Sequence, residues 1–476
     1  MKKQADRRVG GMLLRALPAP VRERLSTGRG DAHKKELLRG GLVSLLFKVF
    51  GMALGYAFTL LITRTYGART MGVFTLFVTV LNIVSIVGRL GFDTALLKFI
   101  AEYASRGRMD LARDVYLKSV KAIVPVGLAL SLLLYFSSPS IAVHLFGKEY
   151  LGPYFQAASF AVVPFSLLSV TAESLRGLKK IKEYSFVQDM AVSLLATALL
   201  ALSFLFTREA FMPFVVYLIS IAVAFVLSLF LWLRKIPAAP AGSGEKVELK
   251  AVLHVSLPIL VSGSLYLFMG WVDKIILGVY APESDVGIYN IALKVSTLTS
   301  LSLLAVNSIA APQFAQCYGS GDTEGLRKIA QQSTRLIFWS SAPVLALFFF
   351  FPSFTLGLFG PEFRAGAAAL LMLTFGQFVN AFSGSVGYLL QMTGRQRVFQ
   401  NVMLFTVAAN LTLNLTLVPR YGMNGAAFAT MCSVILLNMV PFFLIRSYYG
   451  FFTFSPAAVF NLKKRRHGED RGGESR

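Results

Sequence analysis

The chain has 476 residues, of which 55% are hydrophobic and only 15% are charged, and its formal net charge is +23. Soluble domains usually carry about 25% charged residues, whereas here the charges gather between long uncharged stretches such as 123–136 and 336–351. This pattern excludes an ordinary soluble core. Because the basic residues flank apolar stretches, they indicate the loops of a membrane protein and exclude a nucleic-acid surface.

Twelve apolar stretches are long enough to cross a bilayer, which takes roughly 20 residues of helix. Each should be a helix, because lipid offers backbone groups no hydrogen-bond partners and the stretches are too long and continuous for barrel strands. We therefore expect an all-α polytopic membrane protein. The predicted spans are 41–63, 72–92, 121–141, 152–174, 185–206, 211–233, 254–279, 287–312, 333–354, 365–390, 399–418 and 424–446.

The segments between the spans predict the orientation. Of the 47 Lys and Arg residues, 36 lie in or beside segments on the same side as the N-terminus, and 6 lie in loops on the other side. Basic loops remain in the cytoplasm, so both termini are predicted to be cytoplasmic in a multi-pass cell-membrane protein. The basic segment 1–37 has no apolar signal-peptide core. Like 447–476, it is predicted to be a cytoplasmic tail close to anionic lipid.

A polar connector at 235–250 divides the spans into two sets of six, at 38–234 and 251–446. We therefore compared the two halves for an internal repeat. Because six is an even number, both halves enter the membrane in the same sense. The expected architecture is two parallel six-helix lobes around a central cavity, related by an axis along the membrane normal.

Short matches at nearly constant spacing support this repeat. The segment 145–150, which reads LFGKEY, recurs as LFGPEF at 358–363, an offset of 213 residues. Tyr66-Gly67 recurs as Tyr280-Ala281 at an offset of 214. Their common order indicates that the two halves share one fold.

Three motifs resemble a known family. The segment 417–430, LVPRYGMNGAAFAT, resembles the P-x-Y-G-x-x-G-A-A-x-A-T pattern of polysaccharide-biosynthesis flippases. Asp273–Gly278 followed by Val286–Tyr289 resembles that family's seventh and eighth helices, and Arg64 with Tyr66-Gly67 resembles the end of its first helix. The resemblance covers essentially residues 38–446 and extends to the superfamily that holds multidrug exporters and lipid II flippases.

The resemblance implies transport by alternating access of two lobes, with a polyprenyl-diphosphate-linked glycan as cargo. Membrane lipids are further expected partners, and a glycan polymerase or ligase is a candidate protein partner. No nucleic acid, cofactor or metal is expected. Gly425-Ala426-Ala427 also forms a small-residue face, so close helix packing explains much of the 417–430 motif without any contact to cargo.

Charged residues inside the spans are the first candidate site residues, because each costs at least about 2.5 kcal/mol to insert. Lys274 and Lys294 lie on consecutive helices, six residues before Tyr280 and seven after Gly287; both are therefore roughly 10 Å from the outer end. These lysines and Lys48 are predicted to bind the cargo's diphosphate. For Lys48, reaching the inner membrane surface is an equal alternative.

Glu173 and Asp273 are the carboxylates that suit ion coupling or charge pairing. Glu173 is three residues before Arg176, a spacing at which the two side chains can simply pair on a helix. Asp273 is adjacent to Lys274, so the two point about 100° apart. We expect Lys294 to face the cavity and Asp273 to neutralise a neighbouring lysine.

Uncharged polar residues form the second candidate group. They are Asn307, Gln377 and Asn380, with Asn410 and Asn414 one turn apart on the eleventh span. Asn307, Gln377 and Asn380 are predicted to bind sugar hydroxyls of the cargo. Interhelical hydrogen bonding is the alternative for each of them.

No catalytic constellation appears in the sequence. The four histidines, His33, His144, His254 and His467, have no metal-ligand spacing, and no G-x-x-x-x-G-K phosphate loop is present. Two alternatives to a flippase remain open. A cation-coupled multidrug exporter of the same fold would favour a carboxylate-rich cavity, and a membrane glycosyltransferase or polymerase would need a catalytic carboxylate pair and a large outer loop.

Overall fold

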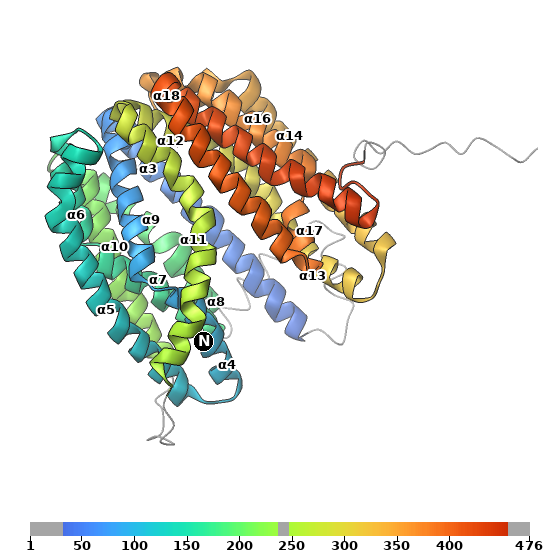
Figure 1. Cartoon of the computed structure of the whole chain (residues 1–476). Coiled ribbons are helices and arrows are strands. Elements are labelled where there is room, and N and C mark those ends of the chain that lie inside the picture. The colour runs from blue at the N-terminus through green and yellow to red at the C-terminus, as the bar shows by residue number, and fades with distance from the viewer. Residues whose placement is uncertain (1–31, 237–246, 456–476) are drawn as a thin grey trace, which may run out of the picture. The chain divides into compact units, whose positions relative to one another are not determined.

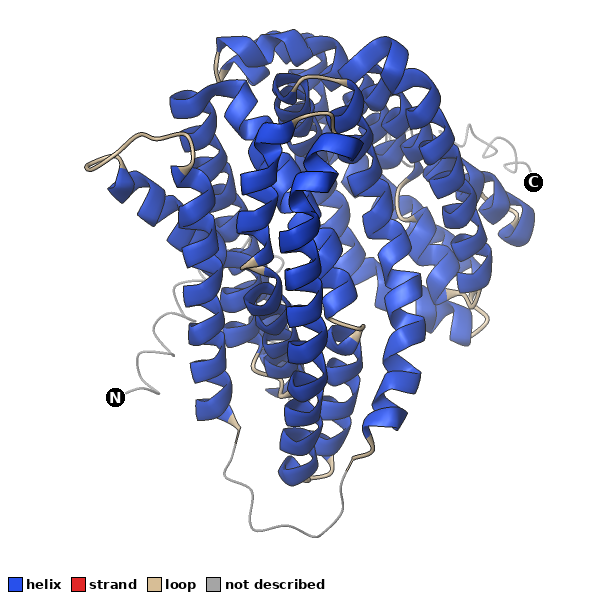
Figure 2. Cartoon of the chain, turned by 60° about the vertical axis from the view of Figure 1, so that its left-hand side comes forward, coloured by secondary structure: helices blue, strands red, loops and turns tan. Residues whose placement is uncertain are grey.

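The computed structural model describes residues 32–236 and 247–455, and within those ranges every regular element is a helix (Figure 2). This confirms the predicted all-α class. Most of the predicted N-terminal tail, connector and C-terminal tail lies outside the described residues, at 1–31, 237–246 and 456–476.

The first half of the chain folds into α, 3-10 and π helices joined by short turns. They are α3 (Ala32–Gly88), α4 (Phe92–Ser105), α5 (Met109–Ser140), η1 (Ile141–Leu145), η2 (Glu149–Leu151), α6 (Gly152–Ser159), α7 (Val162–Gly177), α8 (Ile181–Ser185), η3 (Phe186–Ala191), α9 (Val192–Ser203) and α10 (Met212–Lys235). The two π helices, η1 and η3, extend α5 and precede α9 without a break in the chain direction.

The second half repeats this pattern of long helices and short connectors. Its elements are α11 (Leu249–Tyr280), α12 (Glu283–Ser296), η4 (Thr297–Thr299), α13 (Ser300–Gly319), α14 (Thr323–Phe350), α15 (Pro352–Gly357), η5 (Pro361–Gly366), α16 (Ala367–Ser383), α17 (Val386–Met392) and α18 (Gln396–Tyr449).

Eight of the described helices are long and apolar enough to cross a membrane, or nine if the bent pair α6–α7 is one span. Two of the eight each cover two predicted spans. The helix α3 leaves helical geometry at Gly67, with φ of 78°, and α18 does so at Gly422, with φ of 53°. If the bent pair is counted as one span, α3 and α18 as two each, and α11 over the predicted span 254–279 is added, the total is the twelve predicted spans. Glycine at both kinks is expected, because positive φ is strained for residues with a side chain.

The described chain forms two compact units that do not coincide with the sequence halves. The first contains described residues up to Leu61 with Leu81–Ser138 and Pro153–Leu260, and the second contains Ile62–Val80, Pro139–Gly152 and the described residues from Val261 onward. The second unit thus includes two segments from the first half of the sequence. The predicted boundary between six-helix lobes stays a prediction.

The first unit is held by an apolar core to which α4, α5, α7 and α10 contribute. The helix α7 packs against α4 and α10, and α10 packs against α9. Trp232 and Phe92 are almost completely buried in this core. The Tyr116 hydroxyl meets Thr171 at 3.0 Å, which connects α5 to α7 through one of the core's few polar contacts.

The second unit is built around α16, which packs against α18, α14 and α12. Figure 1 shows α18, α16 and α14 side by side. A second cluster, in which α13 and α17 meet α18, contains Phe314, Leu389 and Ile445. These contacts hold the helices that carry most of the candidate site residues.

Close approach of α3 to η3 generates the first testable prediction. A Cβ atom at Gly51 would lie 1.9 Å from the backbone oxygen of Asp189, whereas one at Gly55 would lie 3.6 Å from Ser193 Oγ, an ordinary contact. Gly51→Val should therefore separate the two elements and lower the free energy of unfolding by about 1–3 kcal/mol. Thermal unfolding in detergent measures this effect. Gly55→Ala is the matched control, and equal stability of both variants would contradict the packing.

Candidate functional site

Among the described residues of the second unit, Asp273 on α11 is the most deeply buried charged residue, only 2% exposed. Tyr289 on α12 donates its hydroxyl to Asp273 Oδ2 at 2.8 Å. Asn414 donates to Oδ1 at 2.7 Å, and the Thr430 hydroxyl makes a short hydrogen bond to Oδ2. Three helices, α11, α12 and α18, therefore converge on one carboxylate.

The surroundings of Asp273 also contain acceptor oxygens without donors. Asn414 gives a second hydrogen bond to the Asn410 carbonyl at 2.9 Å, and Asn410 donates to Ser433 Oγ at 3.1 Å. The Oδ1 atoms of Asn410 and Asn414 are buried and accept no hydrogen bond from the described residues. Buried polar atoms normally have partners, so two such oxygens beside a carboxylate form a region suited to a proton or a hard cation.

The 417–430 motif explains how Thr430 reaches this region. The chain reverses at Gly422, and a Cβ atom at Gly425 would lie 2.5 Å from the Leu417 carbonyl oxygen, so the two arms of α18 touch through their backbones. Thr430 lies on the second arm and Asn414 on the first, and both contact Asp273. The small residues of the motif are therefore packing residues that position two polar side chains.

Lys274 and Lys294 lie beside this network. Lys274 follows Asp273 on α11, and the Asp273 charge acts on it. Lys294 lies in the last turn of α12, and the positive charge of Lys274 acts on it. Both side chains are half-buried. Two ammonium groups that repel one another in apolar surroundings favour the binding of an anion.

The predicted polar residues of the second unit lie on α13 and α16. Gln377 Oε1 accepts from Ser300 Oγ at 2.9 Å and from Asn380 Nδ2 at 3.1 Å, so Gln377 and Asn380 are brought together. Asn307 is buried at 3% exposure, and its Oδ1 accepts no hydrogen bond from the described residues. Gln377 therefore makes an interhelical hydrogen bond, the alternative to binding sugar hydroxyls. The Oδ1 atom of Asn307 remains able to accept a hydrogen bond from another donor.

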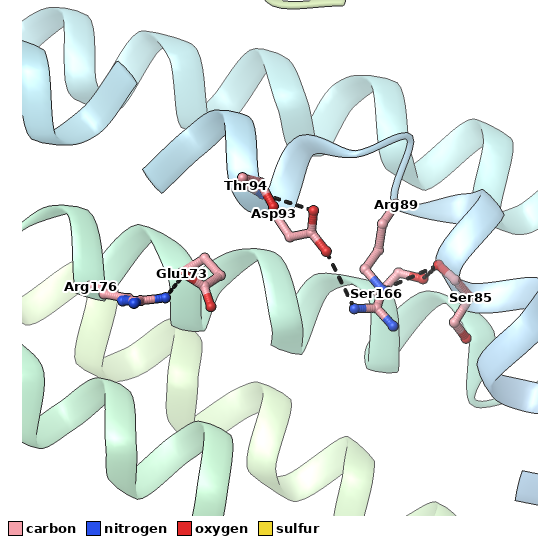
Figure 3. A network of polar contacts seen from close by, with 7 residues as sticks. All are labelled: Ser85, Arg89, Asp93, Thr94, Ser166, Glu173 and Arg176. Atoms are coloured by element: carbon pink, nitrogen blue, oxygen red, sulfur yellow. Dashed lines mark hydrogen bonds and ion pairs between the residues drawn. The ribbon is translucent and has the colours of Figure 1, made fainter. Parts of the chain in front are cut away.

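The first unit contains a separate set of charged groups (Figure 3). Arg89 lies 3.5 Å from the Asp93 carboxylate and donates to the Ser85 carbonyl at 3.4 Å. Glu173 on α7 pairs with Arg176 at 3.4 Å, the contact that their spacing predicts. Glu173 is thus already neutralised by a neighbour on its own helix.

Lys48 and Asp189 lie where α3 approaches η3. Lys48 is half-buried, and its positive charge acts on the Asp189 carboxylate, as does that of Arg176. Lys48 therefore belongs to a mixed group of charges in the first unit. The other predicted cargo-binding residues lie in the second unit.

Sequence reasoning missed Tyr289 and Thr430 as partners of Asp273. Both lie in motifs that resemble the family, Tyr289 in VGIY and Thr430 in GAAFAT. No sequence signal showed that they meet, because Thr430 is 157 residues from Asp273 along the chain.

Comparison with known proteins establishes the family. The family model described as "Polysaccharide biosynthesis protein" matches residues 37–317, more than half of the chain. The chain belongs to this family. A second model, described as MatE, matches residues 258–416. The family predicted from the three motifs is thus confirmed.

Two relatives of the chain come from Haloferax volcanii. The "Probable low-salt glycan biosynthesis flippase Agl15" is 24% identical over 401 residues, which cover 84% of the present chain and 81% of Agl15. The "Probable flippase AglR" is 31% identical over 175 residues, which cover 35% and 36% of the two chains.

Solved structures share the fold. An inward-facing multidrug resistance MATE family transporter of the MOP superfamily superposes with a TM-score of 0.69 at 16% identity, covering 84% of this chain and 94% of that one. The lipid II flippase MurJ, in an inward closed conformation, gives 0.71 at 13% identity and covers 88% and 90%. The chain therefore has a fold found in both kinds of transporter, and its long apolar helices make it a multi-pass membrane protein.

The Asp273 network in this family member yields a stability prediction. Tyr289→Phe removes one donor from a buried carboxylate, so the free energy of unfolding should fall by about 1.5–3 kcal/mol, the usual contribution of a hydrogen bond to a charged group. Thermal unfolding in detergent measures it. Tyr388→Phe is the control, because Tyr388 is 39% exposed. An unfolding temperature unchanged by Tyr289→Phe would show that the hydroxyl does not stabilise Asp273.

Proposed function

We propose that this protein is a flippase that moves polyprenyl-diphosphate-linked oligosaccharides from the cytoplasmic to the outer leaflet by alternating access. No covalent bond is made or broken, so the protein is not an enzyme. The naming of Agl15 as a probable glycan biosynthesis flippase supports the cargo class. The observation that carries the proposal is the half-buried pair of lysines, Lys274 and Lys294, on two successive helices of one unit.

The physical requirement is the transfer of a diphosphate through a region of low dielectric constant. An isolated anion loses its hydration there at a cost of several kcal/mol, and nearby cations offset this cost. Lys274 and Lys294 supply two positive charges. Asn307, Gln377 and Asn380 supply amides for sugar hydroxyls, while Lys48 offers a further cation in the first unit. The lipid tail needs no polar partner, because it remains in the membrane.

A multidrug exporter is the second candidate function, favoured by the match of the MatE model to residues 258–416. The cavity of a multidrug exporter would bind organic cations through its carboxylates. In the second unit the charges beside the single Asp273 carboxylate are the two lysines Lys274 and Lys294. This arrangement favours an anionic cargo.

Reconstitution into liposomes tests both candidates. Purified protein should speed the movement of a fluorescent polyprenyl-diphosphate oligosaccharide between leaflets, measured by access of a glycan-cleaving enzyme added outside. Movement of a cationic dye without movement of the glycan lipid would instead establish the exporter. Transfer of sugar to the lipid by the protein itself would support a transferase.

Lys294 gives the sharpest prediction for this activity. Lys294→Arg should retain transport, whereas Lys294→Ala should lose about tenfold or more, because a hydrogen bond to a charged group contributes about 1.5–3 kcal/mol. Lys294→Glu should be close to inactive, since a second anion repels the diphosphate at low dielectric constant. The measurement is the initial flipping rate at equal protein abundance.

Lys328→Ala is the control for the Lys294 series, because Lys328 is a solvent-exposed residue of α14. A second comparison tests the alternative that Lys294 only neutralises Asp273. In that case Asp273→Asn combined with Lys294→Gln should restore the transport that each single change removes. Normal transport by Lys294→Ala would exclude cargo contact.

We further propose that Asp273, and not Glu173, couples transport to a cation or proton. Glu173 pairs with Arg176, whereas Asp273 lies beside the acceptor oxygens of Asn410 and Asn414. A bound cation would satisfy those oxygens together with the carboxylate.

Coupling predicts a specific loss of response to ion gradients. Liposomes with an imposed sodium, potassium or pH gradient should show faster flipping by the unaltered protein in one of the three cases. Asp273→Asn should abolish this stimulation, and Glu173→Gln should keep it. A full gradient response in Asp273→Asn would refute the coupling role of Asp273.

A further inference from the structure

Two turns and two loops from opposite halves of the sequence meet within the second unit. The turns are residues 64–72 and 278–287, and the loops are 145–150 and 358–363; together they are called the turn–loop cluster. All four lie in the second unit, although 64–72 and 145–150 come from the first half of the sequence. The cluster is therefore a place where the two halves of the chain are joined by contacts.

In one part of the cluster, the loop of the first half holds the turn of the second half. Lys148 Nζ lies 2.8 Å from Glu283 Oε1 and donates to the carbonyls of Gly278 at 2.9 Å and Ala281 at 2.6 Å. The Arg69 guanidinium lies 3.8 Å from the other oxygen of Glu283. The side chain of Glu283 is only 6% exposed, whereas that of Arg69 is 70% exposed.

In the other part, the loop of the second half holds the turn of the first half. Arg64 Nε donates to the Leu358 carbonyl at 2.7 Å, and the backbone N–H of Ala68 donates to Glu362 Oε2 at 2.9 Å. Glu362 also lies beside the kink at Gly67, 3.3 Å from where a Cβ atom would be placed. The two parts thus use equivalent loops, LFGKEY and LFGPEF, with opposite charge: the first loop supplies a cation and the second an anion.

Backbone packing between the turns leaves no room for side chains. A Cβ atom at Gly72 would lie 1.7 Å from the Glu283 carbonyl oxygen, and one at Gly287 would lie 2.3 Å from the Ala68 carbonyl oxygen. These two glycines occupy equivalent positions, 215 residues apart, in the repeat. The two turns therefore pack backbone to backbone, and each contributes one glycine to the contact. Side chains at these two positions would prevent this arrangement of the turns.

We propose that the turn–loop cluster is a releasable gate, which holds the two halves of the chain together in this conformation and separates once in each transport cycle. The proposal rests on the alternating access of the proposed function but not on its cargo. The bonds of the cluster are ion pairs, hydrogen bonds from Lys148 and Arg64 to backbone carbonyls, and the bond from the Ala68 N–H to Glu362, and water can replace each of them once the groups separate. The Lys148–Glu283 pair is largely buried, with side chains 17% and 6% exposed. Removing both charges from water offsets much of their attraction, so separating the pair into water does not prevent opening.

The helix α3 gives a second reason to expect movement at this place. Its residues 62–80 belong to the second unit, while the rest of its described length belongs to the first. Any relative movement of the units must therefore act on the 62–80 segment. The kink at Gly67 and the hydrogen bond from the Ala68 N–H to Glu362 lie within this segment.

A thiol reporter tests the gate without any cargo. In a Cys317→Ala, Cys432→Ala background, Ala68→Cys places a thiol at a residue that is 1% exposed. Its reaction with a water-soluble maleimide should accelerate by about tenfold or more when Lys148→Gln or Glu283→Gln leaves the buried partner unpaired. Lys328→Gln, which removes an exposed ion pair on α14, should leave the rate unchanged. An unchanged rate in both Lys148→Gln and Glu283→Gln would overturn the gate.

Cross-linking then tests whether opening is required for transport. Lys148→Cys with Glu283→Cys, joined by a short bis-methanethiosulfonate reagent, should stop transport until a reductant restores it. The matched control joins Glu324→Cys to Lys328→Cys within α14, where the native side chains lie 3.9 Å apart. Full transport by the cross-linked Lys148–Glu283 variant would show that the cluster is a permanent joint. If no glycan lipid moves even before cross-linking, the cargo proposal fails, whereas the maleimide result still decides the gate.

Discussion

Burial of the Asp273 carboxylate is the constraint on which the second unit depends. A carboxylate removed from water without compensation costs several kcal/mol, and here the compensation comes from Tyr289, Asn414 and Thr430. Because these donors lie on α12 and on both arms of α18, the hydrogen bonds fix α11 against each of them. The sharp reversal at Gly422 and the small residues after it follow from the same need, since they bring the second arm close enough for Thr430 to reach.

The same network places the Asp273 carboxylate and the ammonium groups of Lys274 and Lys294 close together but on different sides of α11. Asp273 turns toward donors on α12 and α18, while Lys274, the next residue of α11, points about 100° away. Lys274 and Lys294 then act on each other as like charges. Oxygen atoms thus lie on one side of α11, and the ammonium groups of α11 and α12 lie on another. In the proposed flippase, this separation would let a cation-linked step and an anionic cargo use neighbouring sites.

The internal repeat has a structural use that goes beyond symmetry. The LFG loops of the two halves each hold the turn of the other half, the first through Lys148 and the second through Glu362. Glycines at 72 and 287 permit the backbone contact between the turns. A pair of weak sequence matches therefore marks residues that contact one another across the repeat.

The sequence alone determined the helical class, the positions of the spans and the family, because a bilayer imposes length and apolarity on each span locally. The small-residue face at Gly425-Ala426-Ala427 was also evident from the 417–430 motif, and the structure shows it in backbone contact with Leu417. The pairing of Glu173 with Arg176 followed from helical spacing. Tertiary structure decided the partners of Asp273, the meeting of Gln377 with Ser300, and the contacts of Lys148 with Glu283. Apart from Tyr289, which is 16 positions from Asp273 but on another helix, those residues are 77 to 157 positions apart. Helical periodicity specifies only which residues share a face of one helix. Which faces then meet depends on the packing of all the helices together, which no local pattern records.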